Sequence, residues 1–509
     1  MVNSYIQGKR EYGAARRNRI VSIALVLMFA IFLAAPVYAM SNAQSSAIQA
    51  FVDEARYKSG VPGIAVSVRV GNEVRYFTSG YANTETLQPV TEETLFELAS
   101  VSKAFTAYGI LLLEEQGLLS MDDPIQKYLP WFTLKYEGKP VDMDKVTLNN
   151  FLHHTSGLTN GKHDMLIPVG EGPDMLRKTV DAFVGAELTF APGERFEYGT
   201  MNYDVLALVA AVVSGQCWED FMQTQVLNPL GLNNTYMYNN AAAATSRLAR
   251  GYGLVFTRVI PYDNQPVMEG NKPAGYIITC AKDMARWSGI QMGLVRDVPE
   301  NCQAIVAKSH QGDTSIPEVN GLRYAAGWYV NFDGTYLTHS GQNLAASTNV
   351  VLYPEEQTAV CLLTNASHIN NMMTENIHAI LLGDLTQSYD IGFLQIFDRI
   401  GTWITIAGVI VTVLFLLLGL RRWRIYRTKT EARHNFVLTI VWSVATVAIL
   451  ALGIMFPTLI GTNWHTAIMA RYYSVAAALA ALALASGSVT WFVFARVILP
   501  LPSSPRFAG

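Results

Sequence analysis

The sequence predicts an α/β domain in which one antiparallel sheet is flanked by helices and carries an inserted helical lobe. Three transmembrane helices are expected to follow it. Strand-like segments gather at both ends of the soluble part, and mainly helical sequence fills the interval. Charged residues make up 15% of the chain but are sparse after Gly401, where long apolar stretches begin. A chain of 509 residues divided in this way contains more than one folding unit.

The soluble domain, with expected bounds 44–389, begins with a helix and a hairpin. An apolar stripe at helical spacing would pack on a sheet: Ile48, Phe51, Val52 and Ala55. Residues 64–70 alternate as in a half-buried strand, and Gly71-Asn72 turns the chain into a second strand over 74–79. Later strands are expected at 323–331, 334–337, 347–352 and 358–364. We expect both sets of strands to form one sheet, with the active-site cleft between sheet and lobe.

The N-terminus, residues 1–39, has the pattern of an export signal. Basic residues precede an apolar run over 20–35, and Val37-Tyr38-Ala39 offers small residues at the cleavage positions. The alternative is an uncleaved anchor helix. The run is shorter than the ~20 residues that a span needs and Pro36 interrupts it, so cleavage after Ala39 is favoured.

Three apolar segments near the C-terminus, 403–420, 436–460 and 474–494, are each long enough to cross a bilayer. The first connection is strongly basic and contains Arg421, Arg422, Arg424, Arg427, Lys429 and Arg433. The second, 461–471, holds one arginine. By the positive-inside rule, the first connection is cytoplasmic and the second is outside. The chain is therefore expected in a bacterial inner membrane as a multi-pass protein, with its catalytic domain in the periplasm.

Charge and cysteine content exclude some classes of partner. A net charge of −3 argues against a broad nucleic-acid surface. The four cysteines show no metal-ligand spacing, and buried free thiols are favoured over a disulfide. His153-His154 has no third ligand at a helpful spacing and is interpreted as structural. No metal and no cofactor are expected.

The motif Ser100-Val101-Ser102-Lys103 lies where a strand-like segment gives way to a helix that runs to Glu115 and is capped by Gly117. At i and i+3 on a first helical turn, the hydroxyl and the ammonium project from one face. The helix N-terminus directs free N–H groups at an oxyanion, and a partly buried lysine can act as the base for the serine. Alone, such a pattern is more often a helix cap followed by a solvated lysine.

Two later motifs favour catalysis. Tyr198 stands just before an apolar helix that starts near Val205, although an isolated tyrosine there would be interpreted as part of the core. The sequence His339-Ser340-Gly341-Gln342-Asn343 follows a strand. Gly341 leaves room for a substrate backbone against the strand edge, and the next N–H is a candidate oxyanion donor.

In this order and at this spacing, the motifs resemble those of the class C-type serine β-lactamases, D-aminopeptidases and esterases, relatives of the penicillin-binding proteins. The stretch Phe151-Leu152-His153-His154-Thr155-Ser156-Gly157-Leu158 is similar to another that is typical of them, and the resemblance covers about 47–365. It implies a β-lactamase-like fold with Ser100 as nucleophile and Lys103 as its base. Tyr198 would assist proton transfer to the leaving group and later to the deacylating water. The amides of Ser100 and Gln342 would form the oxyanion hole.

The chain departs from that family at two positions. Thr200 stands where an asparagine is usual, and His339 stands where relatives that bind carboxylates carry lysine. A histidine near neutrality is mostly uncharged, so strong recognition of a substrate carboxylate is disfavoured.

Both departures, and the apolar tail, resemble the membrane-bound prodrug-activating D-asparagine peptidases of the colibactin-maturing type. The resemblance rests on Thr200, on Gln342-Asn343, on Tyr203-Asp204-Val205-Leu206 and on Ala326-Gly327-Trp328. It implies hydrolysis of the amide that joins an N-acyl-D-asparagine cap to a secondary metabolite. The expected substrate-binding residues are Glu97, Thr200, His339, Gly341 and Asn343, and Glu97 would repel an aspartate carboxylate.

Other functions remain open at this point. A broad class C-type esterase fits the same motifs, whereas His339 weighs against a D,D-peptidase or β-lactamase-like hydrolase. A non-catalytic sensor domain is disfavoured because Ser100, Lys103 and Tyr198 are all present. The expected partners are a small acylated peptide-like substrate and the lipid bilayer, with a membrane exporter or a second copy of the chain as further candidates.

The expected topology can be tested by cysteine labelling of intact cells. A membrane-impermeant reagent should miss a cysteine placed at Thr428 and reach one placed at Thr462, because the arginine-rich connection stays in the cytoplasm. The reverse pattern would place the catalytic domain in the cytoplasm.

Overall fold

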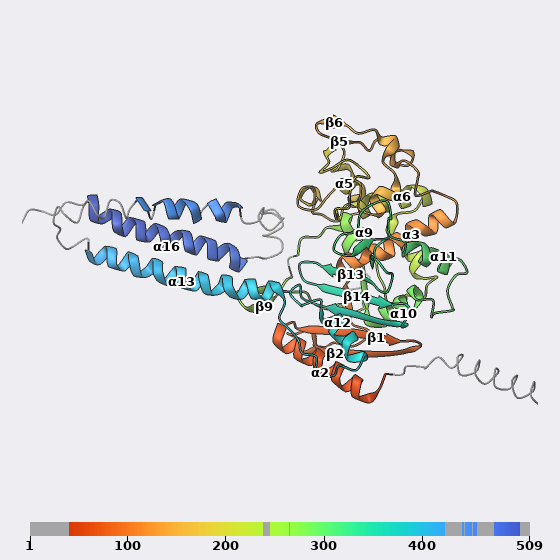
Figure 1. The fold of residues 1–509 in the computed structure, drawn as a ribbon, viewed down its shortest axis with the longest axis horizontal. Helices are drawn as coiled ribbons and strands as arrows, with labels where there is room; N and C mark the ends of the chain where they lie inside the picture. The colour runs from red at the N-terminus through yellow and green to blue at the C-terminus, as the bar shows by residue number, and fades with distance from the viewer. Residues whose placement is uncertain are drawn as a thin grey trace, which may run out of the picture. The chain divides into compact units, whose positions relative to one another are not determined.

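The computed structural model describes residues 40–237, 245–263, 265–422, 440–441, 443–449, 451–455 and 473–498. The predicted signal, 1–39, and the arginine-rich connection after Arg422 lie outside the described residues. Figure 1 shows the chain coloured along its length, with several of its strands and helices labelled.

An eight-stranded sheet has the order β11-β12-β13-β14-β15-β1-β2-β3, and each pair of neighbours is antiparallel. Its strands are β1 (Gly63–Val70), β2 (Glu73–Asn83), β3 (Gln88–Pro89), β11 (Leu322–Tyr324), β12 (Tyr329–Asn331), β13 (Leu337–Gln342), β14 (Ser347–Tyr353) and β15 (Thr358–Thr364). In the β1–β15 pair, Val66 lies opposite Leu362. The predicted union of the two ends of the domain in one sheet is therefore confirmed.

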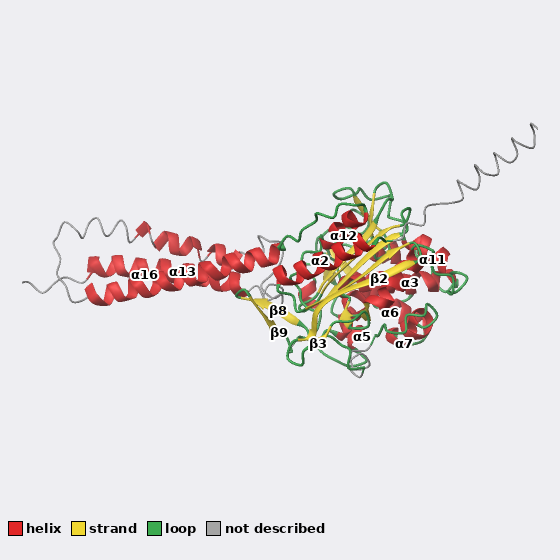
Figure 2. Ribbon diagram, turned by 90° about the horizontal axis from the view of Figure 1, so that it is seen from below, coloured by secondary structure: helices red, strands yellow, loops and turns green. Residues whose placement is uncertain are grey.

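Helices cover both faces of the sheet (Figure 2). On one face lie α2 (Asn42–Ser59), with the predicted apolar stripe buried, and α12 (Met373–Leu381); on the other lies α10 (Ala281–Gln291). The prediction that the first strand is half-buried is wrong, because β1 is central and its residues 63–69 are buried. Arg69 alternates onto the α10 face, where its guanidinium donates to the Ala285 carbonyl at 2.9 Å.

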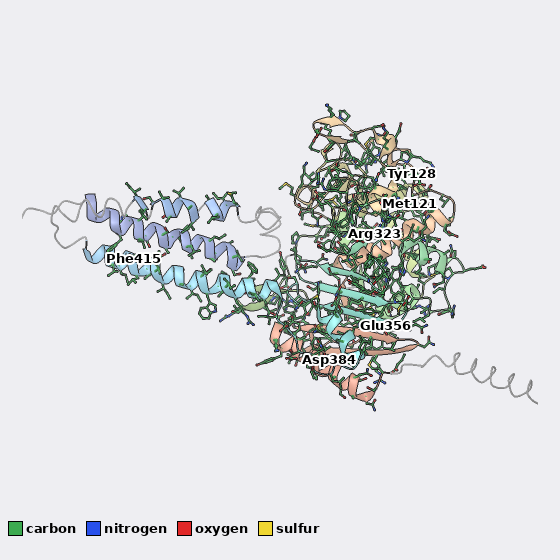
Figure 3. All side chains as sticks on the ribbon, in the orientation of Figure 1. Met121, Tyr128, Arg323, Glu356, Asp384 and Phe415 are labelled. Atoms are coloured by element: carbon green, nitrogen blue, oxygen red, sulfur yellow. The ribbon has the colours of Figure 1, made fainter. Side chains whose placement is uncertain are left out.

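The helical lobe is inserted between β3 and β11, and α3 (Ser102–Glu115) runs through the centre of the domain. The lobe contains α4 (Leu148–Leu152), α5 (Met175–Asp181), α6 (Asn202–Ser214), α7 (Trp218–Phe221) and a small sheet of β5 (Leu134–Tyr136), β6 (Lys139–Pro140) and β7 (Ala186–Glu187). Residues 102–113 of α3 are all buried, since α6, α9 (Lys272–Gly275) and α11 (Cys302–Ser309) pack around them. Figure 3 places Met121 and Tyr128 in the lobe and Glu356 and Asp384 at the sheet end.

Two predicted strands differ from the structure. The segment 323–331 is two strands, β11 and β12, because the chain reverses at Gly327, which has φ +79°. The segment 334–337 is mostly a turn, in which Asp333 accepts a hydrogen bond from the Thr335 amide. The motif from His339 to Gln342 consequently lies within β13 and does not follow a strand.

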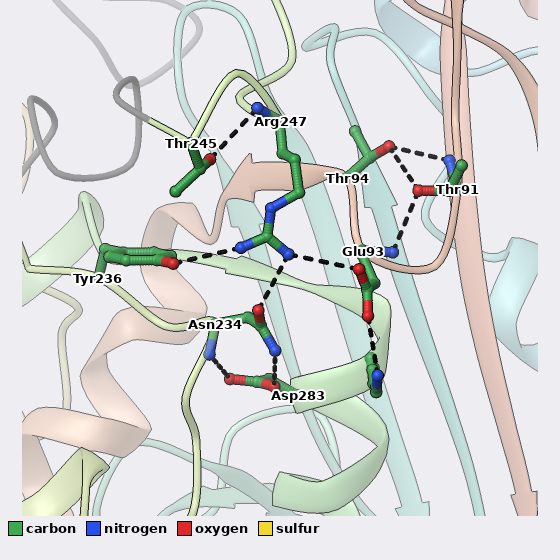
Figure 4. A network of polar contacts seen from close by, with 9 residues as sticks. Thr91, Glu93, Thr94, Asn234, Tyr236, Thr245, Arg247 and Asp283 are labelled. Carbon is green, nitrogen blue, oxygen red and sulfur yellow. Dashed lines mark hydrogen bonds and ion pairs between the residues drawn. The ribbon is translucent and has the colours of Figure 1, made fainter.

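A polar network holds the strand that leads to the nucleophile (Figure 4). The short strand β4 (Leu95–Glu97) pairs with β10 (Ile278–Cys280), and the Leu95 amide donates to the Arg247 carbonyl. The Arg247 guanidinium donates to Asn234 Oδ1 at 2.9 Å and lies 3.6 Å from a Glu93 carboxylate oxygen. These contacts hold β4 in place just before the nucleophile turn.

In the described part of the chain, two helices are long and apolar enough to span a membrane, with candidate spans Leu394–Phe415 and Ser474–Phe492. They belong to α13 (Phe393–Arg422) and α16 (Tyr473–Ile498). Of the second predicted span, 436–460, the structure describes a shorter apolar helix, Ser443–Met455, and the remainder lies largely outside the described residues. The expectation of three spans is thus reduced to two candidates.

The first of these helices starts at Phe393 instead of the predicted Trp403, because its first turns bind the catalytic domain. Gln395 Nε2 donates to the Ser59 carbonyl at 2.7 Å, and Asp398 accepts two hydrogen bonds from the hairpin formed by β8 (Tyr252–Val255) and β9 (Arg258–Pro261). The two long helices then pack through small residues, with Gly408 against Ala481.

Gly327 packs so closely on α3 that a methyl group has no room. A Cβ there would lie 2.4 Å from Ala104 Cα, whereas a Cβ at Gly321 would meet nothing within 4 Å. Both glycines have similar positive φ values, +79° and +75°, so the backbone cost of alanine, about 1 kcal/mol, is shared. Gly327→Ala should therefore lose about 1–3 kcal/mol more stability than Gly321→Ala, measured by thermal unfolding of the purified protein. Equal losses would contradict the close approach.

Candidate active site

The nucleophile motif sits on a strained turn between β4 and α3. Ala99 has φ +48°, a left-handed conformation that is uncommon for a residue with a side chain, and Ser100 follows it in a short 3-10 turn, Ala99–Val101. The preceding residue is held twice: the Leu98 amide donates to the Ile277 carbonyl, and the Leu98 carbonyl accepts from Thr348 Oγ1 at 2.6 Å. Ser100 is thereby fixed where the strand gives way to the helix.

Lys103 is fully buried and lies within reach of the serine. Its Nζ is 3.3 Å from Ser100 Oγ, 3.1 Å from Thr200 Oγ1 and 2.7 Å from the Ala274 carbonyl oxygen. Burial disfavours the ammonium and lowers the pKa of Lys103 to about 7, although the charge of Asp204 opposes the shift. A neutral amine in this position can accept the serine proton at physiological pH.

Tyr198 lies beside these two residues. Its ring centroid is 5.0 Å from Lys103 Nζ, and its buried hydroxyl makes no hydrogen bond of ordinary geometry to any described residue. Burial raises the pKa of Tyr198 well above 10, and the neighbouring Ser100 hydroxyl opposes this only in part. Tyr198 is therefore a neutral phenol at physiological pH, a form that can donate a proton to a leaving group.

The edge of β13 passes directly against the nucleophile turn. A Cβ at Gly341 would lie 2.5 Å from the Leu98 carbonyl oxygen and 2.9 Å from Ala99 Cβ, so glycine is required for this approach. The neighbouring strand β12 pairs with Leu337 and Thr338, and the register ends before His339. An extended substrate could lie along the rest of this edge, and the amides of Ser100 and Gln342 remain the predicted oxyanion donors.

Glu97 and Asn343 form a polar pair on the same side of the site. Asn343 Nδ2 donates to Glu97 Oε2 at 3.1 Å and to the Gly275 carbonyl at 2.7 Å. Burial raises the pKa of Glu97, and the hydrogen bond from Asn343 opposes the shift. Both amide hydrogens of Asn343 are thus committed, and its Oδ1 is left as a hydrogen-bond acceptor.

His339 is buried and has partners at both ring nitrogens. Nδ1 lies 2.7 Å from the Ser340 carbonyl, to which it donates, so Nε2 accepts from the Tyr324 hydroxyl at 3.1 Å. Burial and the nearby Lys103 lower the pKa of His339 to about 3. The ring is therefore neutral and supplies no charge for a substrate carboxylate, and a substrate that contacted it would have to replace Tyr324.

The structure changes the expected role of Thr200 and adds Asp204 and Asn271, which were not predicted as site residues. Thr200 was expected to face the substrate, but its hydroxyl accepts from Lys103. Asp204 is buried under the site and accepts from Asn271 Nδ2 at 2.6 Å; burial raises the pKa of this carboxyl well above 3.8. An acid within the otherwise apolar helix α6 is the sequence signal that could have identified it. Asn271 lies in a separate segment and offered no such signal.

The histidine pair His153-His154 packs against residues of the site. His154 Nδ1 lies 3.0 Å from Asn202 Nδ2, and its ring centroid is 4.4 Å from that of Tyr198. His153 Nδ1 donates to the Tyr324 carbonyl at 2.9 Å. Among the residues that the structure places, no three His, Cys, Asp or Glu side chains are close enough together to hold a metal ion. None of the four cysteines forms a disulfide; Cys217 is exposed, and Cys280, Cys302 and Cys361 are buried.

A model of the family described as Beta-lactamase matches residues 47–385. The chain belongs to the beta-lactamase family. Among similar proteins, the "Protein flp" of Staphylococcus aureus strain MRSA252 is 26% identical over 416 residues, which are 79% of each chain. The penicillin-binding protein 4* of Bacillus subtilis is 27% identical over 326 residues, or 60% of this chain and 68% of the relative.

Two solved structures of similar proteins share the fold. An octameric penicillin-binding protein homologue from Pyrococcus abyssi matches with a TM-score of 0.58 and 26% identity, over 70% of this chain and 81% of the homologue. A beta-lactamase/D-alanine carboxypeptidase from Pseudomonas syringae matches with a TM-score of 0.56 and 19% identity, over 67% of this chain and 99% of that protein. The predicted β-lactamase-like fold of the soluble domain is confirmed.

The lowered pKa of Lys103 predicts how the hydrolytic rate depends on pH. Below about pH 7 the lysine is protonated and cannot act as a base, so kcat/KM should fall tenfold per pH unit there and level off above. Lys103→Ala should lower the plateau at least ~10²-fold and remove this limb. The exposed Lys145→Ala serves as the control and should keep it. A limb that persists in Lys103→Ala would assign the titration to another group.

Two tyrosine variants distinguish a catalytic role from a packing role. Tyr198→Phe removes a phenol beside Ser100 and should lower kcat at least ~10²-fold with little effect on thermal stability. Tyr203→Phe, in contrast, removes a hydrogen bond to the Leu152 carbonyl at 3.0 Å and should cost about 1 kcal/mol of stability with a small change in rate. Steady-state kinetics and thermal unfolding of both variants provide the comparison. Unchanged kinetics in Tyr198→Phe would reduce Tyr198 to a packing residue.

Proposed function

We propose that this protein is a membrane-anchored serine peptidase that hydrolyses an amide through an acyl-enzyme on Ser100. Its substrate is an N-acyl-D-asparagine cap on a secondary-metabolite precursor, and its removal activates the product. The pair formed by Glu97 and Asn343 beside the nucleophile carries this proposal, together with the neutral His339 in the third motif.

The catalytic cycle follows from the three central side chains. Neutral Lys103 takes the proton of Ser100 as the hydroxyl oxygen attacks the substrate carbonyl, and the amides of Ser100 and Gln342 stabilise the oxyanion. Tyr198 donates its proton to the departing amine, and the proton on Lys103 replenishes the phenol. In deacylation, water loses a proton to the same groups and attacks the acyl-enzyme, which returns the Ser100 hydroxyl.

The substrate side chain is selected by hydrogen-bond acceptors. Glu97 and Asn343 Oδ1 both accept, since the hydrogens of the Asn343 amide are already committed. The primary amide of asparagine donates two hydrogens and fits this pair, whereas an aspartate carboxylate has no hydrogen to donate and would meet no cation in the pair. The preference for the D-isomer rests on the resemblance to the D-asparagine peptidases alone.

The apolar C-terminal helices support attachment to a membrane. The two candidate spans and the basic connection after the first one favour a multi-pass arrangement in the bacterial inner membrane, with the catalytic domain in the periplasm. An export signal at the N-terminus would agree with this orientation.

The second candidate is a hydrolase that acts on a peptide with a free carboxylate. Relatives named as penicillin-binding proteins favour it. The neutral His339, which is held by Tyr324 and Ser340, weighs against it, because no cation in this motif would bind the carboxylate.

Amide substrates that differ in one feature test the proposal. The full-length enzyme should hydrolyse a fluorogenic N-octanoyl-D-asparaginyl amide at least ~10-fold faster than its L-isomer or its D-aspartyl analogue, because unpaired buried polar groups cost about 1–3 kcal/mol. Asn343→Ala should impair this substrate far more than a simple acetyl ester. Glu97→Gln should reduce the discrimination against the D-aspartyl analogue. Ser100→Ala serves as the inactive control. Equal rates on all three amides would return the protein to the esterase class.

A further inference from the structure

We infer that the β8–β9 hairpin is a second contact of the catalytic domain with the lipid bilayer. Its tip would lie in the interfacial region where α13 enters the membrane. This inference rests on the membrane attachment proposed above, but it concerns a part of the catalytic domain that the anchoring helices do not include.

A carboxylate fixes the hairpin to the helix that leads into the membrane. Asp398 of α13 is buried, and its two carboxylate oxygens accept hydrogen bonds from the amides of Phe256 at 3.2 Å and Thr257 at 2.6 Å. Five residues further along the same helix, Trp403 is 68% exposed. At ~1.5 Å per residue the two positions are about 7–8 Å apart along the helix axis. Tryptophan favours the membrane–water interface, so the hairpin turn lies at the height of the headgroups.

The side chains at this turn have the character that an interface favours. Phe256 and Ile260 are 37% and 40% exposed, and Arg258 between them is exposed and forms no ion pair with a described residue. Val259 points the other way, since its Cγ2 would lie 3.6 Å from a Cβ at Gly60. Two apolar side chains and a cation thus share the outer face of the hairpin, an arrangement that suits the boundary between acyl chains and headgroups.

The backbone of the hairpin turn is strained. Phe256 and Thr257 connect the two strands with φ +49° and +64°, positions that asparagine and glycine usually occupy in a two-residue hairpin. An aromatic and a β-branched residue are costly there, and the two hydrogen bonds to Asp398 offset the cost. If the turn served shape alone, Asn-Gly would form it without strain. Asp398 thereby holds the exposed Phe256 in a fixed position at the turn.

Another exposed aromatic residue in the same domain offers a matched comparison. Phe332 is 73% exposed in the turn between β12 and β13, and its amide donates to the Gly321 carbonyl. No hydrogen bond joins it to the described part of the C-terminal helices. An exposed phenylalanine on a hairpin is thus available as a control without a link to α13.

Site-directed fluorescence quenching in proteoliposomes tests the inference. The background is the full-length protein with Cys217→Ser, in which the remaining cysteines are buried. One cysteine is then introduced for labelling with an environment-sensitive fluorophore, as Phe256→Cys, Ile260→Cys, Phe332→Cys or Val413→Cys. The vesicles contain phosphatidylethanolamine, phosphatidylglycerol and a lipid with a nitroxide near its headgroup, and iodide serves as the aqueous quencher. Hydrolysis of the amide substrate shows that each variant is folded.

Labels at 256 and 260 should be quenched at least twofold more by the nitroxide lipid than the label at 332, and should be protected from iodide. The label at 413, on an exposed position of α13, should also be protected. The hairpin contact would be overturned, and the membrane anchor retained, if the label at 413 were protected from iodide while the labels at 256 and 260 were quenched like the label at 332. Exposure of 413 to iodide would overturn both, and strong lipid quenching at 332 would overturn the assignment to this hairpin.

Discussion

The burial of one amine governs the rest of the site. Lys103 Nζ is buried, and it contacts the Ala274 carbonyl, the Thr200 hydroxyl and the Ser100 hydroxyl. An unfolded lysine keeps its proton until about pH 10. Between pH 7 and 10 folding therefore releases a proton, so burial of this lysine costs stability that is regained as the pH rises. The surrounding contacts, including the close approach of Gly327 to Ala104, supply the packing that offsets this cost.

Several features of the fold could be predicted because they depend on local pattern. The stripe on α2, the β1–β2 hairpin and the helix after Ser100 follow from periodicity, turn residues and a terminating glycine. Burial of β1 on both faces could not be predicted in this way, because its polar residues find partners, such as Ala285 for Arg69, far away in the sequence. The start of α13 was misplaced for the same reason, since Asp398 in its first turns accepts hydrogen bonds from the distant β8–β9 hairpin.

The residues of the site also fall into those that local pattern identifies and those whose role depends on distant contacts. The motif residues Ser100, Lys103 and Tyr198 were identifiable because spacing and order carry the family pattern, and the structure brings their side chains together. The contacts that their neighbours make could not be predicted in this way, although Thr200, Glu97 and Asn343 were expected at the site. Thr200 contacts the lysine, and Asn343 turns its amide toward Glu97, through tertiary contacts that no single segment encodes. A neutral His339 was expected from chemistry, but its enclosure by Tyr324 depends on where β11 is placed.

The pairing of β1 with β15 has a consequence for the order in which the chain can fold. Val66 finds its partner Leu362 only after nearly the whole domain has been synthesised, and contacts so distant in sequence form slowly. If the chain crosses a membrane from its N-terminus, β1 and β2 arrive first, and the largely apolar strand β1 keeps one edge unpaired until β15 follows. The apolar helix α13 follows β15 by fewer than thirty residues, Thr364 to Phe393. Completion of the sheet and arrest in the membrane would therefore fall close together in time, and the nascent hairpin is the part most in need of a chaperone.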